Sequence, residues 1–81
     1  MTVLLFGVTR DIVGAGSLQI PPAEAKELKT VADLKKHLKN GYPDLDGLSS
    51  LAVAVNQQYA EENHPLGKMD EIALIPPVSG G

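Results

Sequence analysis

The last ten residues of the sequence read Ile72-Ala73-Leu74-Ile75-Pro76-Pro77-Val78-Ser79-Gly80-Gly81, an apolar run that changes abruptly into two prolines and then two glycines. The run 72–75 has no polar alternation, which is typical of a strand with both faces covered. The prolines lack the backbone N–H that a sheet ladder needs, so the strand must stop before them. Because proline also restricts its own φ and favours an extended residue before it, residues 76–81 are predicted to form an extended, flexible tail. Residues 1–75 then form a single folded domain.

Composition restricts the kind of protein. The 81 residues are 43% apolar, which is enough for one modest core in which about 60% of the unfolded chain's surface becomes buried. Cysteine is absent, which excludes disulfides, thiolate metal sites and a cysteine nucleophile, and agrees with a reducing compartment. No apolar run approaches the roughly 20 residues that span a bilayer. A net charge of −3 without a basic stripe argues against nucleic acid. We therefore expect a cytoplasmic protein, not bound to membranes, whose partners are other proteins.

Four more runs of apolar and β-forming residues predict the remaining strands, with the first in the middle of the sheet because it lacks polar alternation. They are Thr2–Phe6, Ser17–Ile20, Leu51–Val55 and a short strand that begins at Tyr59-Ala60. One helical turn closed by Gly14 is expected between the first two, and Asn56-Gln57-Gln58 is expected to turn the chain before the last. The stretch Gly14-Ala15-Gly16-Ser17 lacks the lysine and the long helix of a phosphate-binding loop.

One helix is predicted after Thr30, whose side chain can cap it and which is followed by Asp33 in an approximate capping-box relation. Its apolar face is formed by three side chains at helical spacing, Val31, Leu34 and Leu38. Lysines occupy the opposite side, and Asn40-Gly41 ends the helix. The charged segment 23–29 before it shows no pattern that predicts an element.

Several motifs with compatible spacing point to a known family. They are Leu5-Phe6-Gly7, Arg10-Asp11, Gly14, Ala54-Val55-Asn56-Gln57, His64-Pro65-Leu66 and the final Ile-Pro-Pro-Val-Ser-Gly-Gly. Over nearly its whole length the chain resembles the small-subunit family of molybdopterin synthase, which are ubiquitin-like sulfur carriers. Met69 stands where that family usually carries glycine, with Gly67 as a possible substitute, so the turn type there stays open. The resemblance implies an α+β fold, the ubiquitin-like β-grasp: a mixed sheet of four to five strands, its first and last strands parallel at the centre, with one main helix packed on one face.

The resemblance also implies a function in molybdenum cofactor biosynthesis. A ubiquitin-activating-like adenylyltransferase would use ATP to adenylate the carboxylate of Gly81, and a persulfide donor would convert it to a thiocarboxylate. The carrier would then donate this sulfur to a cyclic pyranopterin precursor within the large subunit of molybdopterin synthase, in a heterotetramer of two small and two large subunits. Gly80 and Gly81 lack side chains and can enter a narrow channel. No bound cofactor or metal is expected, and as a sulfurtransferase subunit the chain is expected to have no catalytic pocket of its own.

Partner-binding residues are predicted at three places. An uncovered sheet face carrying Phe6, Tyr59 and Ile75 is expected to dock the large subunit, because a single helix covers only one face. Arg10 is expected to contact the activating enzyme, with a local ion pair as the alternative role. The tail residues expected to enter the partners are Pro76, Pro77, Val78 and Ser79.

Two other functions share the fold and the Gly-Gly end. One is a ubiquitin-like protein modifier, which would form an isopeptide bond through Gly81. The other is the sulfur carrier of thiamin thiazole synthesis, whose likeness to this chain is confined to the final glycines.

Overall fold

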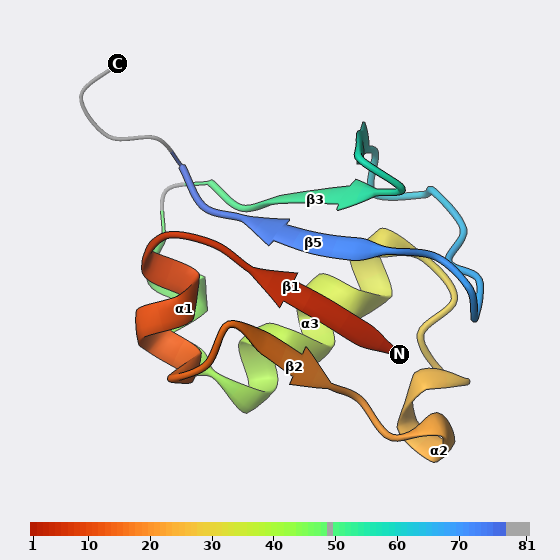
Figure 1. Ribbon diagram of the computed structural model, residues 1–81, viewed down its shortest axis with the longest axis horizontal. Helices are drawn as coiled ribbons and strands as arrows, with labels where there is room; N and C mark the ends of the chain where they lie inside the picture. Colours follow the sequence, from red (N-terminus) through yellow and green to blue (C-terminus); the bar gives the residue numbers. More distant parts are fainter. Residues whose placement is uncertain (49, 78–81) are drawn as a thin grey trace.

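The computed structural model describes residues 1–48 and 50–77 of the chain. Its strands are β1 (Thr2–Leu5), β2 (Ser17–Gln19), β3 (Ala52–Val55), β4 (Gln58–Ala60) and β5 (Ile72–Ile75). They form one five-stranded sheet in the order β2-β1-β5-β3-β4 (Figure 1). β1 and β5 are parallel neighbours, whereas the other pairs are antiparallel. The predicted mixed sheet, with the first and last strands parallel at its centre, is confirmed.

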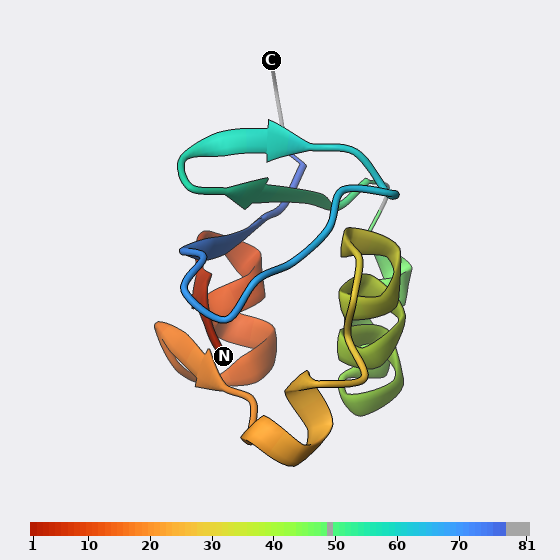
Figure 2. The same cartoon turned by 90° about the vertical axis from the view of Figure 1, so that its right-hand side faces the viewer.

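The helical segments are α1 (Val8–Val13), α2 (Pro22–Ala25), α3 (Val31–Gly41) and the 3-10 helix η1 (Pro43–Gly47). α3 is the main helix, and Figure 2 shows it standing on one side of the sheet. Its capping box is complete: the Asp33 N–H donates to Thr30 Oγ1 at 3.3 Å, and the Thr30 N–H donates to Asp33 Oδ2 at 3.2 Å. Two donors that the helix leaves unpaired are thereby satisfied, as the sequence predicted.

The core lies between the sheet and α3. The helix contributes the predicted face of Val31, Leu34 and Leu38, all buried. The strands contribute alternate side chains, because successive residues of a strand point to opposite faces. These are Val3, Leu5, Val53, Val55, Ile72 and Leu74. Leu45 and Leu51 are also buried, so the irregular crossover between α3 and β3 is held to the core through its leucines.

The structure differs from the sequence-based interpretation at residues 23–29 and at β5. Residues 23–29 are not without structure, since α2 begins at Pro22, where the missing N–H removes no helical hydrogen bond. β5 is not covered on both faces: Ile72 and Leu74 are buried, whereas Ala73 and Ile75 are half-buried. The apolar run of β5 therefore combines a core face with an apolar face that the domain does not cover.

The hairpin between β3 and β4 turns on Asn56 and Gln57, which have φ values of 53° and 69°. Two positive φ values in a two-residue loop are the geometry of a type I′ turn, whose twist suits the flanking strands. Gln58, expected in the turn, already belongs to β4. The Asn56 side chain donates to Asp70 Oδ1 at 2.9 Å and accepts from the Glu71 N–H at 3.0 Å. This side chain therefore joins the hairpin to the segment that leads into β5.

The same Asp70 closes the turn around Met69. Its Oδ2 accepts from the Gly67 N–H at 2.7 Å, and its own N–H donates to the Gly67 carbonyl at 3.3 Å. Gly67 does not have a positive φ, so it does not supply the special backbone conformation that the sequence suggested for it. Met69 points into solvent and is 95% exposed. The turn is thus held by the Asp70 carboxylate, and the side chain at position 69 is free to vary.

We expect the pKa of Asp70 to report on this network. Hydrogen bonds from the Asn56 side chain and then from the Gly67 N–H lower the pKa of Asp70 below its ordinary value of 3.8. Because the folded-state pKa is depressed, the carboxylate stabilises the fold above about pH 4, and this stabilisation is lost as the pH falls through the folded-state pKa. In Asn56→Ala, an NMR titration should show the pKa of Asp70 raised. An unchanged titration would contradict the assigned cause. The difference in Tm between wild type and Asp70→Asn should shrink below pH 4.

Candidate functional site

The exit of the C-terminal segment defines the candidate site. Because β1 and β5 are parallel, their carboxyl ends lie at the same end of the sheet, with Leu5 opposite Leu74. The turn from β1 into α1 therefore lies beside the residues that follow β5, as Figure 1 shows at the left of the sheet. Pro76 and Pro77 form no regular element and are half-buried. The chain thus leaves the sheet in contact with the domain surface.

The turn from β1 into α1 is tightly constrained. The Thr9 N–H donates to the Phe6 carbonyl at 3.2 Å, which closes a four-residue turn with Gly7 at its second position. Gly7 has φ 56° and ψ −135°, close to the conformation that a type II′ turn requires there and that favours glycine. The Thr9 side chain is fully buried, and its Oγ1 accepts from the Phe6 N–H at 3.0 Å and donates to the Phe6 carbonyl at 2.5 Å. A satisfied buried hydroxyl fixes this turn to the end of β1.

Gly7 and Pro76 are in direct contact. A Cβ added at Gly7 would lie 3.0 Å from Pro76 Cγ and 3.9 Å from Pro76 Cδ. Any side chain at position 7 would therefore displace the proline ring. No sequence pattern singled out this contact; the only signal was a glycine directly after a strand.

Arg10 lies on α1 at the same end of the molecule and is exposed. Its guanidinium lies along Gly16, where an added Cβ would be 3.5 Å from Nη2. Among the described residues no carboxylate forms an ion pair with it. With Asp11 and three glycines it lines a shallow hollow of about 640 Å³ beside the exit, formed by Gly7, Arg10, Asp11, Gly14, Ala15 and Gly16. The structure therefore places this cation in a hollow that is also lined by Gly7, the neighbour of Pro76.

The sheet carries apolar side chains on the face away from α3. One cross-strand row runs Leu4, Ala73, Ala54, Tyr59, because each residue is paired with the next. In a second row Ile75 is paired with Ala52. Phe6 lies next to Ile75 in this row, because the two residues directly follow the paired residues Leu5 and Leu74. We call these seven residues the open face: Leu4, Phe6, Ala52, Ala54, Tyr59, Ala73 and Ile75.

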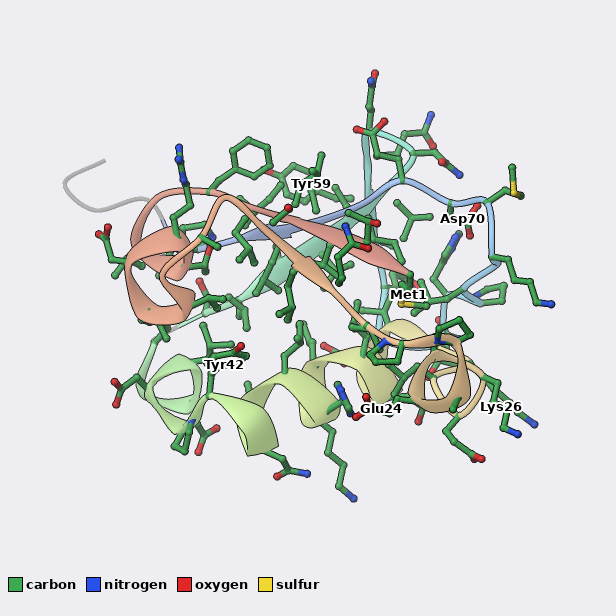
Figure 3. The ribbon with its side chains drawn as sticks, turned by 60° about the horizontal axis from the view of Figure 1, so that its bottom comes forward. Met1, Glu24, Lys26, Tyr42, Tyr59 and Asp70 are labelled. Carbon is green, nitrogen blue, oxygen red and sulfur yellow. The ribbon has the colours of Figure 1, made fainter. Side chains whose placement is uncertain are left out.

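The large side chains of the open face are accessible. Tyr59 is 75% exposed and Phe6 49%, while Ile75 is half-buried. Figure 3 shows Tyr59 on the far side of the sheet from α3. The structure thus brings the predicted residues Phe6, Tyr59 and Ile75 onto one face. Large exposed apolar side chains gathered in this way mark sites of protein association more often than chance.

The remaining predicted site residues, Val78, Ser79, Gly80 and Gly81, lie outside the described residues. Within residues 1–48 and 50–77, no group of three His, Asp or Glu side chains is placed to hold a metal ion. No helix in that part of the chain is both long and apolar enough to cross a membrane.

Comparison with known proteins agrees with this geometry. The ThiS family model matches residues 3–81. The molybdopterin synthase sulfur carrier subunit of Dictyostelium discoideum is 34% identical over 84 residues, covering 98% of this chain and 93% of that protein. The subunit of the same name from Escherichia coli (strain K12) is 35% identical over 83 residues, covering 98% and 96%.

A solved structure gives the same result for the fold. SAMP1 from Haloferax volcanii, a small archaeal modifier protein, has a TM-score of 0.74 and 27% sequence identity, covering 99% of this chain and 97% of that chain. The ubiquitin-like β-grasp predicted from the sequence is confirmed.

Proposed function

This chain belongs to the ThiS family, and from that membership we propose that it is the sulfur carrier subunit of a molybdopterin synthase. The observation that supports the proposal most strongly is the similarity to proteins of that name over nearly the full length of both chains. The geometry agrees, because the strand that precedes the Pro-Pro segment lies at the centre of the sheet, so that Pro76 and Pro77 follow it at one end of the sheet. The reaction takes place in the cytoplasm.

The chemistry proceeds through the carboxylate of Gly81. A carboxylate oxygen attacks the α-phosphate of ATP on an activating enzyme, and pyrophosphate leaves, which makes the carboxyl carbon electrophilic. The terminal sulfur of a persulfide attacks this carbon, so that a C–S bond forms and AMP leaves. A thiol then attacks the donor's own sulfur and cleaves the S–S bond of the persulfide, which leaves a disulfide on the donor and a thiocarboxylate on the carrier. The sulfur is nucleophilic and is passed to a cyclic pyranopterin precursor held by the large subunit.

In the proposed reaction this chain positions its own terminal carboxylate and provides the surfaces that contact its partners. Beyond Pro77, the segment Val78–Gly81 has four residues, which reach at most about 13 to 14 Å when extended. That length allows the carboxylate to enter a buried pocket while the domain stays outside. The open face docks the large subunit in an assembly of two small and two large subunits, and Arg10 contacts the activating enzyme.

Mass spectrometry tests the proposal directly. Incubated with an activating enzyme of the ubiquitin type, ATP and a persulfide donor, the protein should gain the mass difference of one oxygen replaced by sulfur. Fragmentation should place that change in the C-terminal peptide. The thiocarboxylated protein, mixed with a large subunit and the cyclic precursor, should then form molybdopterin. Thiocarboxylation without molybdopterin formation would show that the protein is a sulfur carrier of another pathway. If neither product forms, the proposal is wrong.

A prediction for the open face concerns affinity for the large subunit. Phe6→Ala or Ile75→Ala should weaken association by about 1 to 3 kcal/mol, because apolar anchors in the centre of an interface contribute most of its affinity. Met69→Ala is the matched control, since Met69 is 95% exposed but lies outside the open face. Calorimetry should show a raised Kd for the first two variants and an unchanged Kd for the control. Unchanged affinity in both Phe6→Ala and Ile75→Ala would refute this docking surface.

A second prediction concerns Arg10. In Arg10→Ala, kcat/KM for adenylation should fall severalfold through KM, because one charged contact with the activating enzyme is lost. Stability should be nearly unchanged, since exposed charges contribute only about 0 to 1 kcal/mol. Lys36→Ala is the control, because Lys36 is an exposed cation on α3, away from the exit. Equal adenylation kinetics in Arg10→Ala and wild type would show that Arg10 does not contact the activating enzyme.

The likeness to SAMP1 favours one second candidate, a protein modifier joined to lysine side chains through Gly81. Both functions begin with the same adenylate and differ in the nucleophile that attacks it. Protein purified from its own cells distinguishes them: isopeptide-linked conjugates that carry the C-terminal glycines would support a modifier, and a free thiocarboxylate would support the carrier.

A further inference from the structure

We infer that Gly7 is a positioning residue for the sulfur-transfer reaction: its missing side chain leaves room for the Pro76 ring, and this contact sets the direction in which the tail leaves the sheet. The inference rests on the proposed function, because it assigns to a residue far from Gly81 in sequence a role in placing the reacting carboxylate. Pro76 is the first residue beyond β5, so a contact there acts on everything that follows.

The space around Gly7 is specific to the proline ring. An added Cβ would lie 3.0 Å from Pro76 Cγ, tighter than ordinary van der Waals contact between carbon atoms. Gly14 provides the contrast: its φ is also positive, at 86°, but a Cβ added there would have no neighbour within 4 Å. At Gly14, which caps α1, glycine is favoured only by the positive φ of the backbone. At Gly7, glycine is favoured both by the positive φ and by the contact with Pro76.

Both sides of this contact are held by the centre of the sheet. On one side, the Thr9 hydroxyl and the Thr9 N–H bind the Phe6 backbone and fix the turn that contains Gly7. On the other side, β5 is paired with β1 up to Leu74 and with β3 up to Ile75, the residue before Pro76. Proline adds its own restriction of φ. The ring thus rests against a rigid surface, and the exit direction is fixed before any partner binds.

The direction matters because an angular error grows along the tail. The five residues from Pro77 to Gly81 extend about 17 Å, so a tilt of about 10° at Pro76 displaces the carboxylate by about 3 Å. Reacting atoms must be held within roughly 3 to 3.5 Å of each other. A partner can bring a displaced carboxylate back into position only by bending the tail. The free energy of that bending offsets part of the binding free energy that a fixed exit direction saves.

Kinetics of four variants test the inference. The set comprises Gly7→Ala, Gly14→Ala, Pro76→Ala and the double variant Gly7→Ala/Pro76→Ala, each assayed as the full chain with activating enzyme, ATP and persulfide donor. Gly7→Ala should lower kcat of thiocarboxylation about tenfold with KM changed less than twofold, whereas Gly14→Ala should leave kcat within twofold of wild type. Pro76→Ala should also lower kcat. The double variant should be no slower than Gly7→Ala, because both changes remove the same contact.

A readout without activity separates this inference from the proposed function. The chain has no cysteine, so Ser79→Cys gives a single site for a nitroxide spin label. Paramagnetic broadening of backbone NMR signals by this label should be uneven over the domain in wild type. Gly7→Ala and Pro76→Ala should change that pattern, and Gly14→Ala should preserve it.

The kinetic and NMR results together can overturn the inference about Gly7 separately from the proposed function. If Gly7→Ala and Pro76→Ala keep the wild-type broadening pattern and wild-type kcat, the inference is wrong even though the carrier function stands. If the effects of the two substitutions on kcat multiply in the double variant, the inference is also wrong, because the two residues would then act independently and not through one contact. If wild type is not thiocarboxylated, the proposed function fails, and the broadening pattern still decides whether Gly7 directs the tail. Should Gly7→Ala fail to fold, Pro76→Ala, which keeps the Gly7 turn intact, tests the same contact.

Discussion

Deletion of Gly81 should abolish thiocarboxylation, with a loss of at least a thousandfold in kcat/KM for adenylation, while leaving the fold intact. The deletion withdraws the carboxylate by one residue, about 3.3 Å, which exceeds the tolerance for in-line attack on a phosphate held by the activating enzyme. Among the described residues the last strand ends at Ile75, so the deletion lies outside every described strand. Intact-mass measurement after incubation with activating enzyme, ATP and sulfur donor gives the result directly.

Three companion variants show that position is the cause. An alanine added after Gly81 moves the carboxylate outward and should be equally inactive, and Gly80→Ala should be impaired because its side chain obstructs a narrow channel. Ser79→Ala, which keeps the length and both glycines, should lose far less activity than the shortened or the extended chain. Tm should be the same in all of them. Efficient thiocarboxylation of the shortened or the extended chain would show that the terminal carboxylate is not the reacting group.

Leu74→Ala should reduce the free energy of unfolding by about 2 to 5 kcal/mol, which is a large share of the total for a domain of this size. Leu74 is fully buried in β5 and is paired with Leu5 on one side and Val53 on the other. Its truncation therefore leaves a cavity at the point where the two halves of the sheet meet. Urea denaturation followed by circular dichroism measures the loss.

The neighbouring residue Ile75 supplies the matched control, because it lies on the same strand but on the open face and is half-buried. Ile75→Ala should cost less than half as much stability as Leu74→Ala. An equal loss in the two variants would mean that the open face is as well packed as the core. That result would contradict its assignment as a surface left for a partner.

Most of the fold could be predicted because several signals were local. The face formed by Val31, Leu34 and Leu38 follows directly from helical spacing, and Thr30 and Asp33 cap the helix through their own backbone neighbours. The pairing of β1 with β5 was different in kind. No local pattern encodes which strands become neighbours across the length of the chain, so that prediction depended on resemblance to a family.

The features that escaped prediction depend on contacts or on partners. β5 was expected to be covered on both faces because apolar residues on an open face are indistinguishable in sequence from core residues. Gln57 adopts a positive φ although glutamine is not a typical turn residue, since the hairpin's register requires it. The contact between Gly7 and Pro76 joins residues that are far apart in sequence, and a lone glycine does not reveal its neighbour.

The position of β5 also has a consequence for synthesis. Without this strand, β1 and β2 form one hairpin and β3 and β4 another, and no other ladder within residues 1–48 and 50–77 joins them. β5 is synthesised after the other four strands, so the two hairpins cannot be joined until residues 72–75 have been made. The closing step pairs β1 with β5, which are far apart in sequence, and we expect a step of that kind to be slow. A chain interrupted before residue 72 therefore cannot complete its sheet, and it also lacks the Gly-Gly segment on which the proposed function depends.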